Sequence, residues 1–451
     1  MRRAAGRRGR VAWPFRAAII VATAFFGLAD RQLCNNSKSL WPGRRQRQRR
    51  LGQATRLRRH AADTPQPQRM KELTIEQGPI RPPSEAGSLL FRFTRNCPWN
   101  QCTFCTVYKG KPFSRRSLGE IKADIDAAAE IFEDLRALSS RLGFSGSFPR
   151  EALEIVFTGS RYNDFYRQAA LWLHAGKGSV FIQDANSFVL PAAVICEAIS
   201  HLKRKIPGIT RITSYGRSAT LSRMPLAALE QIRKAGLDRV HIGMESGSDR
   251  VLELIRKGVS AKRQAEAGKK VVEAGMELSE YIMPALGGRE FSEEHARESA
   301  RILNEIGPHF IRLRSLRIPS RAPLYTDWQE GRFTPLTDDE TAAEIRLFIS
   351  LLDGISTRVK SDHIMNLLEE VDGELPLDKE KMLAVIDRYL GMPEKERLLF
   401  RLGRRGGALR TLDELENPAM RRRLETAIKD LAPEAAGDLE RLIKELADQY
   451  I

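Results

Sequence analysis

Short apolar segments alternate with helical segments between residues 88 and 316, and this alternation limits the fold more than any other feature of the sequence. The six apolar segments, each typical of a strand, span residues 88–94, 180–182, 211–214, 239–243, 278–283 and 310–316. Helical patterns lie between most of them, at residues 117–142, 192–205, 225–235, 249–256, 261–274 and 293–306. Such an alternation predicts an α/β fold with a parallel sheet. Functional residues in these folds lie at the C-terminal ends of the strands.

Two regions have a less regular pattern. Between residues 143 and 179 the sequence is ambiguous, because residues 153–157 fit a short strand and residues 162–174 fit a helix. The region 326–451 is mostly helical, for instance at residues 338–352 and 379–389. Between these two helices, residues 362–369 are rich in groups that could reach the end of the sheet where a site would form.

Three of the five cysteines lie within nine residues, at Cys97, Cys102 and Cys105, directly after the first predicted strand. Three thiols cannot all pair as disulfides, so one would be left over. A structural zinc site normally has four ligands, and no fourth Cys or His lies nearby in the sequence. A complete iron–sulfur cubane also takes four ligands, so three cysteines would leave one iron open to a small molecule. The residues alone leave a zinc knuckle and an iron–sulfur cluster as alternatives.

The segment Cys97-Pro-Trp-Asn-Gln-Cys102-Thr-Phe-Cys105 resembles the cluster motif of the radical S-adenosylmethionine (SAM) superfamily. In that family three cysteines bind a [4Fe–4S] cluster, and SAM binds the fourth iron. The resemblance implies that an electron from the cluster cleaves SAM to a 5′-deoxyadenosyl radical, which abstracts hydrogen from the substrate. Phe104 matches an aromatic residue that lies near the adenine of SAM in the family. The first spacer, residues 98–101, has four residues where the usual C-x3-C-x2-C motif has three.

The resemblance covers about residues 86–325 and implies a partial (β/α)6 barrel of the radical SAM type. We therefore expect a core barrel at 70–325 and a mostly helical C-terminal region at 326–451. The resemblance is strongest to the coproporphyrinogen-oxidase and methylthiotransferase branches, although no cysteine cluster follows residue 105 to hold an auxiliary cluster. It also implies an electron donor, such as a flavodoxin or ferredoxin, and a small-molecule or other substrate.

Polar residues after the second and third predicted strands are candidates for SAM binding by this resemblance. Asp184, Asn186 and Ser187 follow the second strand, where many members have a Gly-Gly-Glu segment that meets the SAM amino group. The alternative is that they cap the next helix. Arg217 has a guanidinium that suits the SAM carboxylate, and Tyr215 is a candidate for ribose or substrate contact. The alternative for this pair is an ordinary surface loop.

A second similarity lies after the fourth predicted strand. Residues 242–247 are similar to a Gly-x-Glu/Gln-Ser segment whose polar residues approach the ribose or methionine of SAM, which makes Glu245 and Ser246 candidates. Lys257 falls where some relatives have a basic residue near the SAM carboxylate, and the alternative is a solvated cation at a helix end. His241 lies within a strand and Cys196 within a helix, so we expect both to be packed structural residues.

The positive charge of the chain is concentrated at its N-terminal end. The formal net charge is +17, and residues 1–69 contain 17 Lys or Arg against 2 Asp or Glu. The apolar run 17–29 is too short to span a bilayer. We expect 1–69 to be a disordered head or an over-extended start with Met70 as the true initiator, and a targeting segment is the alternative. An oxygen-sensitive cluster fits a cytoplasmic protein without a membrane segment better than a secreted one.

A binding module without catalysis is the alternative to an enzyme. It would bind zinc through the three cysteines, or RNA through basic segments at 401–410 and 421–423. Acidic residues are nearly as numerous in this part of the chain, which favours solvated helix faces over an RNA surface. Nucleic acid is therefore a less expected partner than a small molecule.

Overall fold

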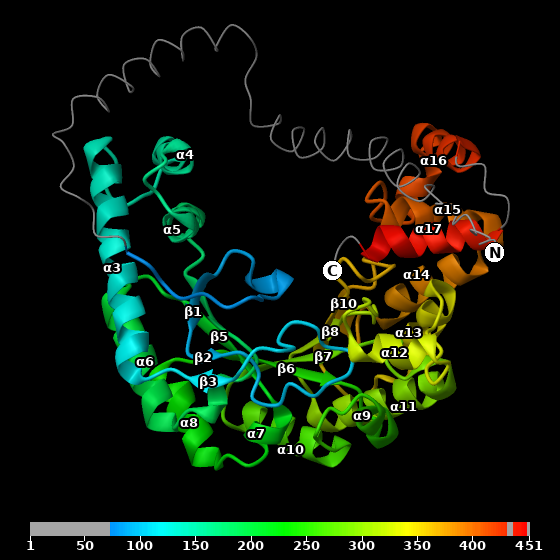
Figure 1. The fold of residues 1–451 in the computed structure, drawn as a ribbon, viewed down its shortest axis with the longest axis horizontal. Helices are drawn as coiled ribbons and strands as arrows, with labels where there is room; N and C mark the ends of the chain where they lie inside the picture. The colour runs from blue at the N-terminus through cyan, green and yellow to red at the C-terminus, as the bar shows by residue number, and fades with distance from the viewer. Residues whose placement is uncertain (1–72, 431–435, 449–451) are drawn as a thin grey trace, which may run out of the picture. The chain divides into compact units, whose positions relative to one another are not determined.

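The computed structural model describes residues 73–430 and 436–448. These residues belong to two compact units, which divide between Gly391 and Met392 (Figure 1). The predictions for the basic head and for the Met70 start lie outside the described residues. The first unit includes residues 326–391, which the sequence analysis assigns to the C-terminal region.

An eight-stranded sheet forms the centre of the first unit, and its strands follow one another in chain order (Figure 1). They are β1 (Leu89–Arg92), β4 (Ser179–Gln183), β5 (Arg211–Gly216), β6 (Arg239–Glu245), β7 (Glu277–Ile282), β8 (Phe310–Leu313), β9 (Thr357–Lys360) and β10 (Gly373–Leu375). The pairs from β1 to β9 are parallel, and β10 runs antiparallel to β9. Strands β1 and β10 do not pair, so the barrel is partial, as expected from the sequence. The six predicted strands are confirmed, whereas the short, charged β9 and β10 were missed.

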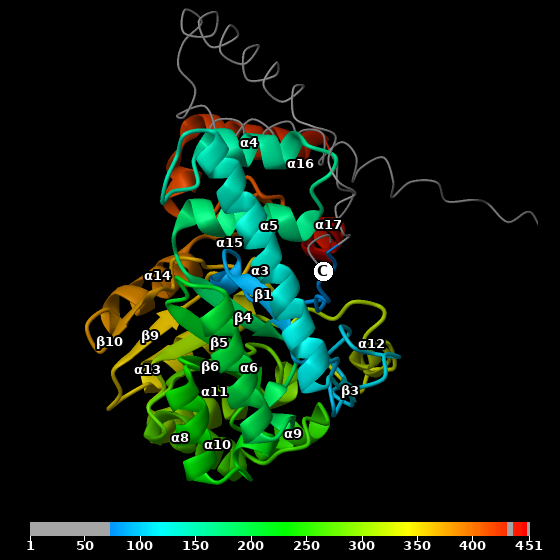
Figure 2. The same ribbon diagram turned by 90° about the vertical axis from the view of Figure 1, so that its left-hand side faces the viewer.

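Seven helices cover the outside of the sheet and pack against one another in chain order (Figures 1 and 2). They are α3 (Leu118–Arg141), α6 (Ala192–Lys205), α8 (Leu226–Ala235), α10 (Ala261–Glu273), α11 (Gly288–Ile306), α13 (Asp338–Leu351) and α14 (Lys379–Gly391). Their ends follow from local sequence. The Ser117 hydroxyl accepts a bond from the Glu120 amide while the Glu120 carboxylate accepts one from the Ser117 amide, which is a capping box.

Shorter elements complete this unit. They are η1 (Pro83–Glu85), β2 (Thr94–Arg95), β3 (Ser114–Arg115), α4 (Arg150–Thr158), α5 (Asp164–Ala175), η2 (Ser187–Val189), α7 (Ser218–Leu221), α9 (Asp249–Leu254) and α12 (Pro323–Gln329). Residues 153–157, considered a short strand, are helical, so that interpretation was wrong. Ala152 and Val156, four residues apart, both have 0% exposure, and this helical spacing buries one face of α4.

The second unit is helical. It contains α15 (Glu394–Arg405), η3 (Asp413–Glu416), α16 (Pro418–Asp430) and α17 (Ala436–Asp448). The expected solvated face at 401–410 is corrected in part, because Arg401, Arg404 and Arg405 are buried and have partners. Arg422 and Arg423 are exposed, as expected. Among the described helices of both units, none is long and apolar enough to cross a membrane.

The inner face of the barrel carries a row of aromatic rings. Phe181, Tyr215, His241 and Tyr281 lie on successive strands from β4 to β7, with neighbouring ring centroids 5.1, 5.7 and 5.7 Å apart. Side chains alternate between the two faces of a strand, so the neighbours of His241 on β6 point outward. The row connects the middle of the barrel to the C-terminal ends of the strands.

His241 makes a testable contribution to stability. Its side chain is fully buried, and burial lowers its pKa to about 4 from 6.5, so the ring is neutral in the folded protein at pH 7. The unfolded chain binds the extra proton below pH 6.5, so the free energy of unfolding should decrease as the pH falls from 6.5 to 4. We expect a loss of about 3 kcal/mol from this residue. Urea unfolding across this pH range would measure it. In His241→Leu the free energy of unfolding should lose this part of its dependence on pH. An unchanged pH dependence would contradict the assignment of His241 as a buried, neutral residue.

Candidate active site

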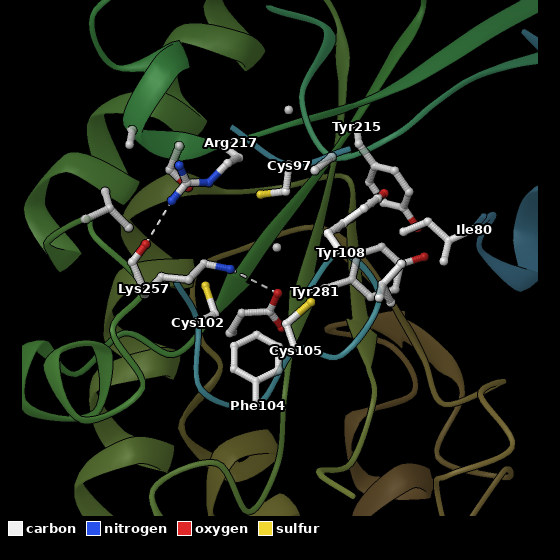
Figure 3. A pocket seen from close by; sticks show the side chains of 18 of the residues that line it. Ile80, Cys97, Cys102, Phe104, Cys105, Tyr108, Tyr215, Arg217, Lys257 and Tyr281 are labelled. Carbon is white, nitrogen blue, oxygen red and sulfur yellow. Dashed lines mark hydrogen bonds and ion pairs between the residues drawn. The ribbon is translucent and has the colours of Figure 1, made fainter. Parts of the chain in front are cut away.

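A pocket of about 1080 Å³, including the part open to solvent, lies at the C-terminal ends of the central strands. Its walls come from the cysteine loop after β1, from residues at the ends of β4, β5, β6, β7 and β8, and from the loop after α9. The predicted site residues that line it are Cys97, Cys102, Phe104, Cys105, Tyr215, Arg217, Glu245 and Lys257. The structure thus brings most of the predicted residues together (Figure 3).

The three clustered cysteines all line this pocket and are partly accessible. No three Cys, His, Asp or Glu side chains in the part of the chain that the structure describes converge on a point that a single metal ion could occupy. A zinc ion would need each sulfur at about 2.3 Å. An iron–sulfur cluster instead binds each thiolate through a different iron, which spreads the sulfurs apart. Three thiolates on one pocket wall are a donor set that a cluster with one open iron could use.

The loop between Cys97 and Cys102, which holds the extra residue of the motif, is fixed by Asn100. The backbone of Asn100 has a φ of 50°, which short polar residues such as Asn tolerate. Its amide donates to the Cys97 sulfur at 3.4 Å, and its side-chain nitrogen donates to the Tyr108 carbonyl at 2.7 Å. Lys109 donates to the Asn100 carbonyl at 2.7 Å. An amide directed at a sulfur suits a thiolate that carries charge.

Trp99, in the same loop, attaches the cysteine segment to the loop after α9. Its indole nitrogen donates to the Arg256 carbonyl at 2.7 Å. A Cβ on Gly258 would lie 2.3 Å from the Trp99 ring, so only glycine allows this close contact. The Arg217 guanidinium lies 5.3 Å from the ring centroid, within range of a cation–π interaction.

Replacement of Trp99 with alanine should loosen the cysteine loop without unfolding the barrel. We expect such a protein, after anaerobic reconstitution, to release iron to a chelator several-fold faster than wild type, because the loop loses a hydrogen bond and a ring contact. Trp99→Phe keeps part of the ring contact and should give an intermediate rate. Equal release rates for Trp99→Ala and wild type would contradict the anchoring role.

Charged side chains surround Cys102. Burial raises the pKa of its thiol, and the positive charges of Lys257 and Arg217 oppose that shift. Lys257 donates to the Glu245 carboxylate at 3.1 Å, and both side chains are largely buried. Arg217 donates to the Lys257 carbonyl at 2.8 Å (Figure 3). The Lys257 amine also lies 5.8 Å from the Phe104 ring centroid. The two cations would stabilise thiolates or an anionic ligand here.

Glu245 reaches the pocket through an irregularity of β6. Its register with β7 shifts between Gly243 and Glu245, and the φ of Glu245 is 66°, in a region that non-glycine residues rarely adopt. Strain of this kind persists where the surrounding structure holds it, and often at functional sites. Lys257 is therefore not the solvated helix-end cation that the sequence left open, since it is buried and paired with this carboxylate.

Four predicted residues do not line the pocket. Asp184 is fully buried and pairs with Arg92, and its φ is 71°. Asn186 donates to the Thr220 hydroxyl at 2.8 Å and accepts from the Arg217 amide at 3.3 Å, so its side chain neither faces the pocket nor caps a helix. Ala185 between them takes the place on the wall.

Ser187 and Ser246 are the other two. Ser187 accepts a hydrogen bond from the Ser214 hydroxyl at 3.1 Å and is buried. Ser246 is fully buried, and its hydroxyl lies 2.8 Å from Nδ1 of His295. These side chains hold the strand ends in place, because their polar groups are used inside the protein.

The structure adds pocket residues that the sequence analysis did not name as site candidates. They are Ile80, Val107, Tyr108, Ala185, Val259, Tyr281, Arg314 and His363, with glycines and small residues between them. Tyr281 and Arg314 lie at the ends of β7 and β8, and strand alternation could have placed them on the inner face. His363 belongs to the segment 362–369, which was expected to reach this end of the sheet.

The comparison with protein families identifies the chain. Residues 163–301 match the family model described as the Radical SAM superfamily. The match supports the radical SAM identification over this part of the chain. Members of this superfamily bind a [4Fe–4S] cluster and SAM. The matched residues begin after the cysteine segment, so the assignment does not depend on the unusual spacing of Cys97, Cys102 and Cys105.

Individual relatives are distant. The chain is 22% identical over 125 residues to a tRNA uridine(34) acetyltransferase of Methanocaldococcus infernus, a match that covers 28% of this chain and 23% of that protein. It therefore spans less than a quarter of the length of this curated relative. Among solved structures, methylornithine synthase is 16% identical with a TM-score of 0.36, covering 60% of this chain and 63% of that chain. The hydrogenase maturase HydG from Carboxydothermus hydrogenoformans is 14% identical with a TM-score of 0.35, covering 80% and 82%.

Proposed function

We propose that this protein is a radical SAM enzyme in which Cys97, Cys102 and Cys105 hold the [4Fe–4S] cluster. The observation that carries the proposal is that three thiols and two cationic side chains, Arg217 and Lys257, line one pocket at the C-terminal end of the barrel. The chemistry that cluster and SAM supply when bound is reductive cleavage of the sulfonium and abstraction of hydrogen from a substrate.

In this proposal the side chains of the pocket bind and orient SAM and the substrate. Arg217 presents a planar guanidinium whose geometry suits the carboxylate of SAM. The Glu245 carboxylate, held by Lys257 at 3.1 Å, offers an acceptor for an ammonium or a ribose hydroxyl. Phe104 provides a flat apolar face for the adenine, and Tyr215 a ring and hydroxyl for ribose or substrate. Burial of this pocket wall excludes water from the reacting groups.

Asp184, Asn186 and Ser187 have a different role in this proposal from the contact with the SAM amino group that the resemblance implies. Since Asp184, Asn186 and Ser187 use their side chains inside the protein, contacts with the SAM amino group at this position would come from backbone atoms. Asp184 and Asn186 then position the residues around the pocket. Asp184 pairs with Arg92, and the side-chain oxygen of Asn186 accepts a hydrogen bond from the Arg217 amide.

Product analysis tests the proposed function. Anaerobically reconstituted protein with SAM and a reductant is expected to form 5′-deoxyadenosine and methionine. A flavodoxin or ferredoxin is the electron donor that we propose in the cell, where we place the protein in the cytoplasm. Protein that holds zinc and forms neither product would instead support a binding module without catalysis.

We propose a small molecule or an RNA nucleotide as the substrate. The curated relatives are named as enzymes of tRNA uridine(34), and they match over 28% and 25% of this chain. A small molecule and an RNA nucleotide are both substrate classes that a pocket of this kind suits. Assays with SAM should therefore include nucleotides as well as small carboxylic acids.

A further inference from the structure

Aromatic side chains gather on one side of the pocket. Tyr108, Tyr215, Tyr281 and Ile80 lie together there, on the side opposite Lys257 and Arg217 (Figure 3). The hydroxyls of Tyr108 and Tyr281 are buried without a well-formed hydrogen bond; that of Tyr108 lies beside the Asp184 carboxylate and that of Tyr281 beside Ser84. Buried tyrosine hydroxyls usually find a partner, so two without a well-formed bond beside a cavity indicate groups that a ligand would satisfy.

Arg314 is the charged residue of this side. It follows β8 directly, lines the pocket and is exposed. Its guanidinium makes no hydrogen bond or ion pair with any residue that the structure describes. Its position is set by the backbone, because its amide donates to the Ile282 carbonyl at 3.0 Å. Burial raises the pKa of Tyr215 and lowers that of His363; the charge of Arg314 opposes the first shift and adds to the second, so it lies close to both residues.

The other charged groups of the pocket do not neutralise Arg314. Glu245 is paired with Lys257, and Arg217 is bonded to the Lys257 carbonyl and lies over the Trp99 ring. Burial and the charge of Arg314 lower the pKa of His363 to about 4, so its ring is neutral at pH 7. One free positive charge therefore remains beside the tyrosine rings.

We propose that Arg314 binds an anionic group of the substrate, a carboxylate or a phosphate, while an apolar or planar part of the substrate packs against the tyrosine rings. The proposal rests on the proposed function, since it assigns the cysteine side to cluster and SAM. A guanidinium forms two parallel hydrogen bonds to either anion, and aromatic rings supply apolar contact area at low entropic cost. The hydroxyls of Tyr108 and Tyr281 would add donors for the substrate.

Small aromatic probes test this assignment. Benzoate, phenyl phosphate and phenol share a ring, and only the first two carry an anionic group at pH 7. We expect calorimetric titration of reconstituted protein with SAM to show binding of at least one anionic probe. Arg314→Met should weaken that binding by about tenfold or more, the size expected for hydrogen bonds to a charged group, and leave phenol binding unchanged. The tighter anionic probe distinguishes a carboxylate from a phosphate.

Arg141 on α3 is a matched control, because it is exposed and does not line the pocket. Arg141→Met should bind every probe as wild type does. Equal anion binding by wild type and Arg314→Met, or no anion binding by wild type, would overturn the proposal. Loss of SAM affinity in Arg314→Met would overturn it as well, since the arginine would then belong to the SAM site. Failure to load iron or bind SAM counts against the proposed function instead, and the probe titrations on apo protein still test Arg314.

Discussion

Replacement of Cys102 with alanine is expected to abolish both cluster loading and SAM cleavage. Cys102 lies among the charged side chains of Lys257, Arg217 and Glu245, and burial raises the pKa of its thiol while the two cations oppose that shift. Two remaining thiols would leave two irons without protein ligands, which a cubane does not tolerate in a stable form. Iron analysis of anaerobically reconstituted protein, together with an assay for 5′-deoxyadenosine, would measure both effects.

Cys196 provides the control for this variant. It lies on α6 and is not among the pocket residues. Cys196→Ala should load iron and cleave SAM as wild type does, so any loss in Cys102→Ala cannot be assigned to a general effect of removing a thiol. Cleavage of SAM by Cys102→Ala at the wild-type rate would contradict the assignment of the cysteine loop.

Replacement of Gly243 with alanine should separate SAM binding from cluster binding. A Cβ at this position would lie 2.3 Å from Oε1 of Glu245 and 3.3 Å from Nζ of Lys257. The fold can accept the methyl group by moving the Glu245 side chain, but the moved carboxylate no longer has its present place beside the pocket. We expect SAM affinity to fall by about tenfold or more, in line with an overpacking cost of about 1–3 kcal/mol, while iron content stays unchanged.

Gly87→Ala is the matched substitution, because a Cβ on Gly87 meets no atom within 4 Å. It should leave both SAM affinity and iron content unchanged. Titration of the reduced protein with SAM, followed by electron paramagnetic resonance, measures the affinity. Wild-type affinity in Gly243→Ala would show that the Glu245–Lys257 pair does not contribute to the SAM site.

The sequence was sufficient for the parts of the fold that depend on local pattern. Alternating strands and helices predicted the parallel sheet, and residues directly at strand ends, such as Tyr215 and Glu245, were correctly expected at one edge. Strand β9 was missed because its sequence, Thr-Arg-Val-Lys, is short and charged, and it pairs only in the context of β8. Propensity carries little information for such a segment.

The direction of a side chain was harder to predict than its place on a strand end. Asp184 and Asn186 lie at the expected edge, yet they turn inward because Arg92 and the Arg217 amide are there to bind them. Those partners come from segments 92 and 31 residues away in the chain. The role proposed for Arg314 likewise depends on its having no ion-pair partner among the residues that the structure describes, and only the assembled structure shows that.

The metal content of anaerobically purified wild-type protein tests the central claim most directly. The account predicts about four iron and four sulfide per chain, with a brown colour that fades on exposure to air. A single zinc per chain with no iron would contradict it, because three thiols on one zinc leave no site for SAM reduction.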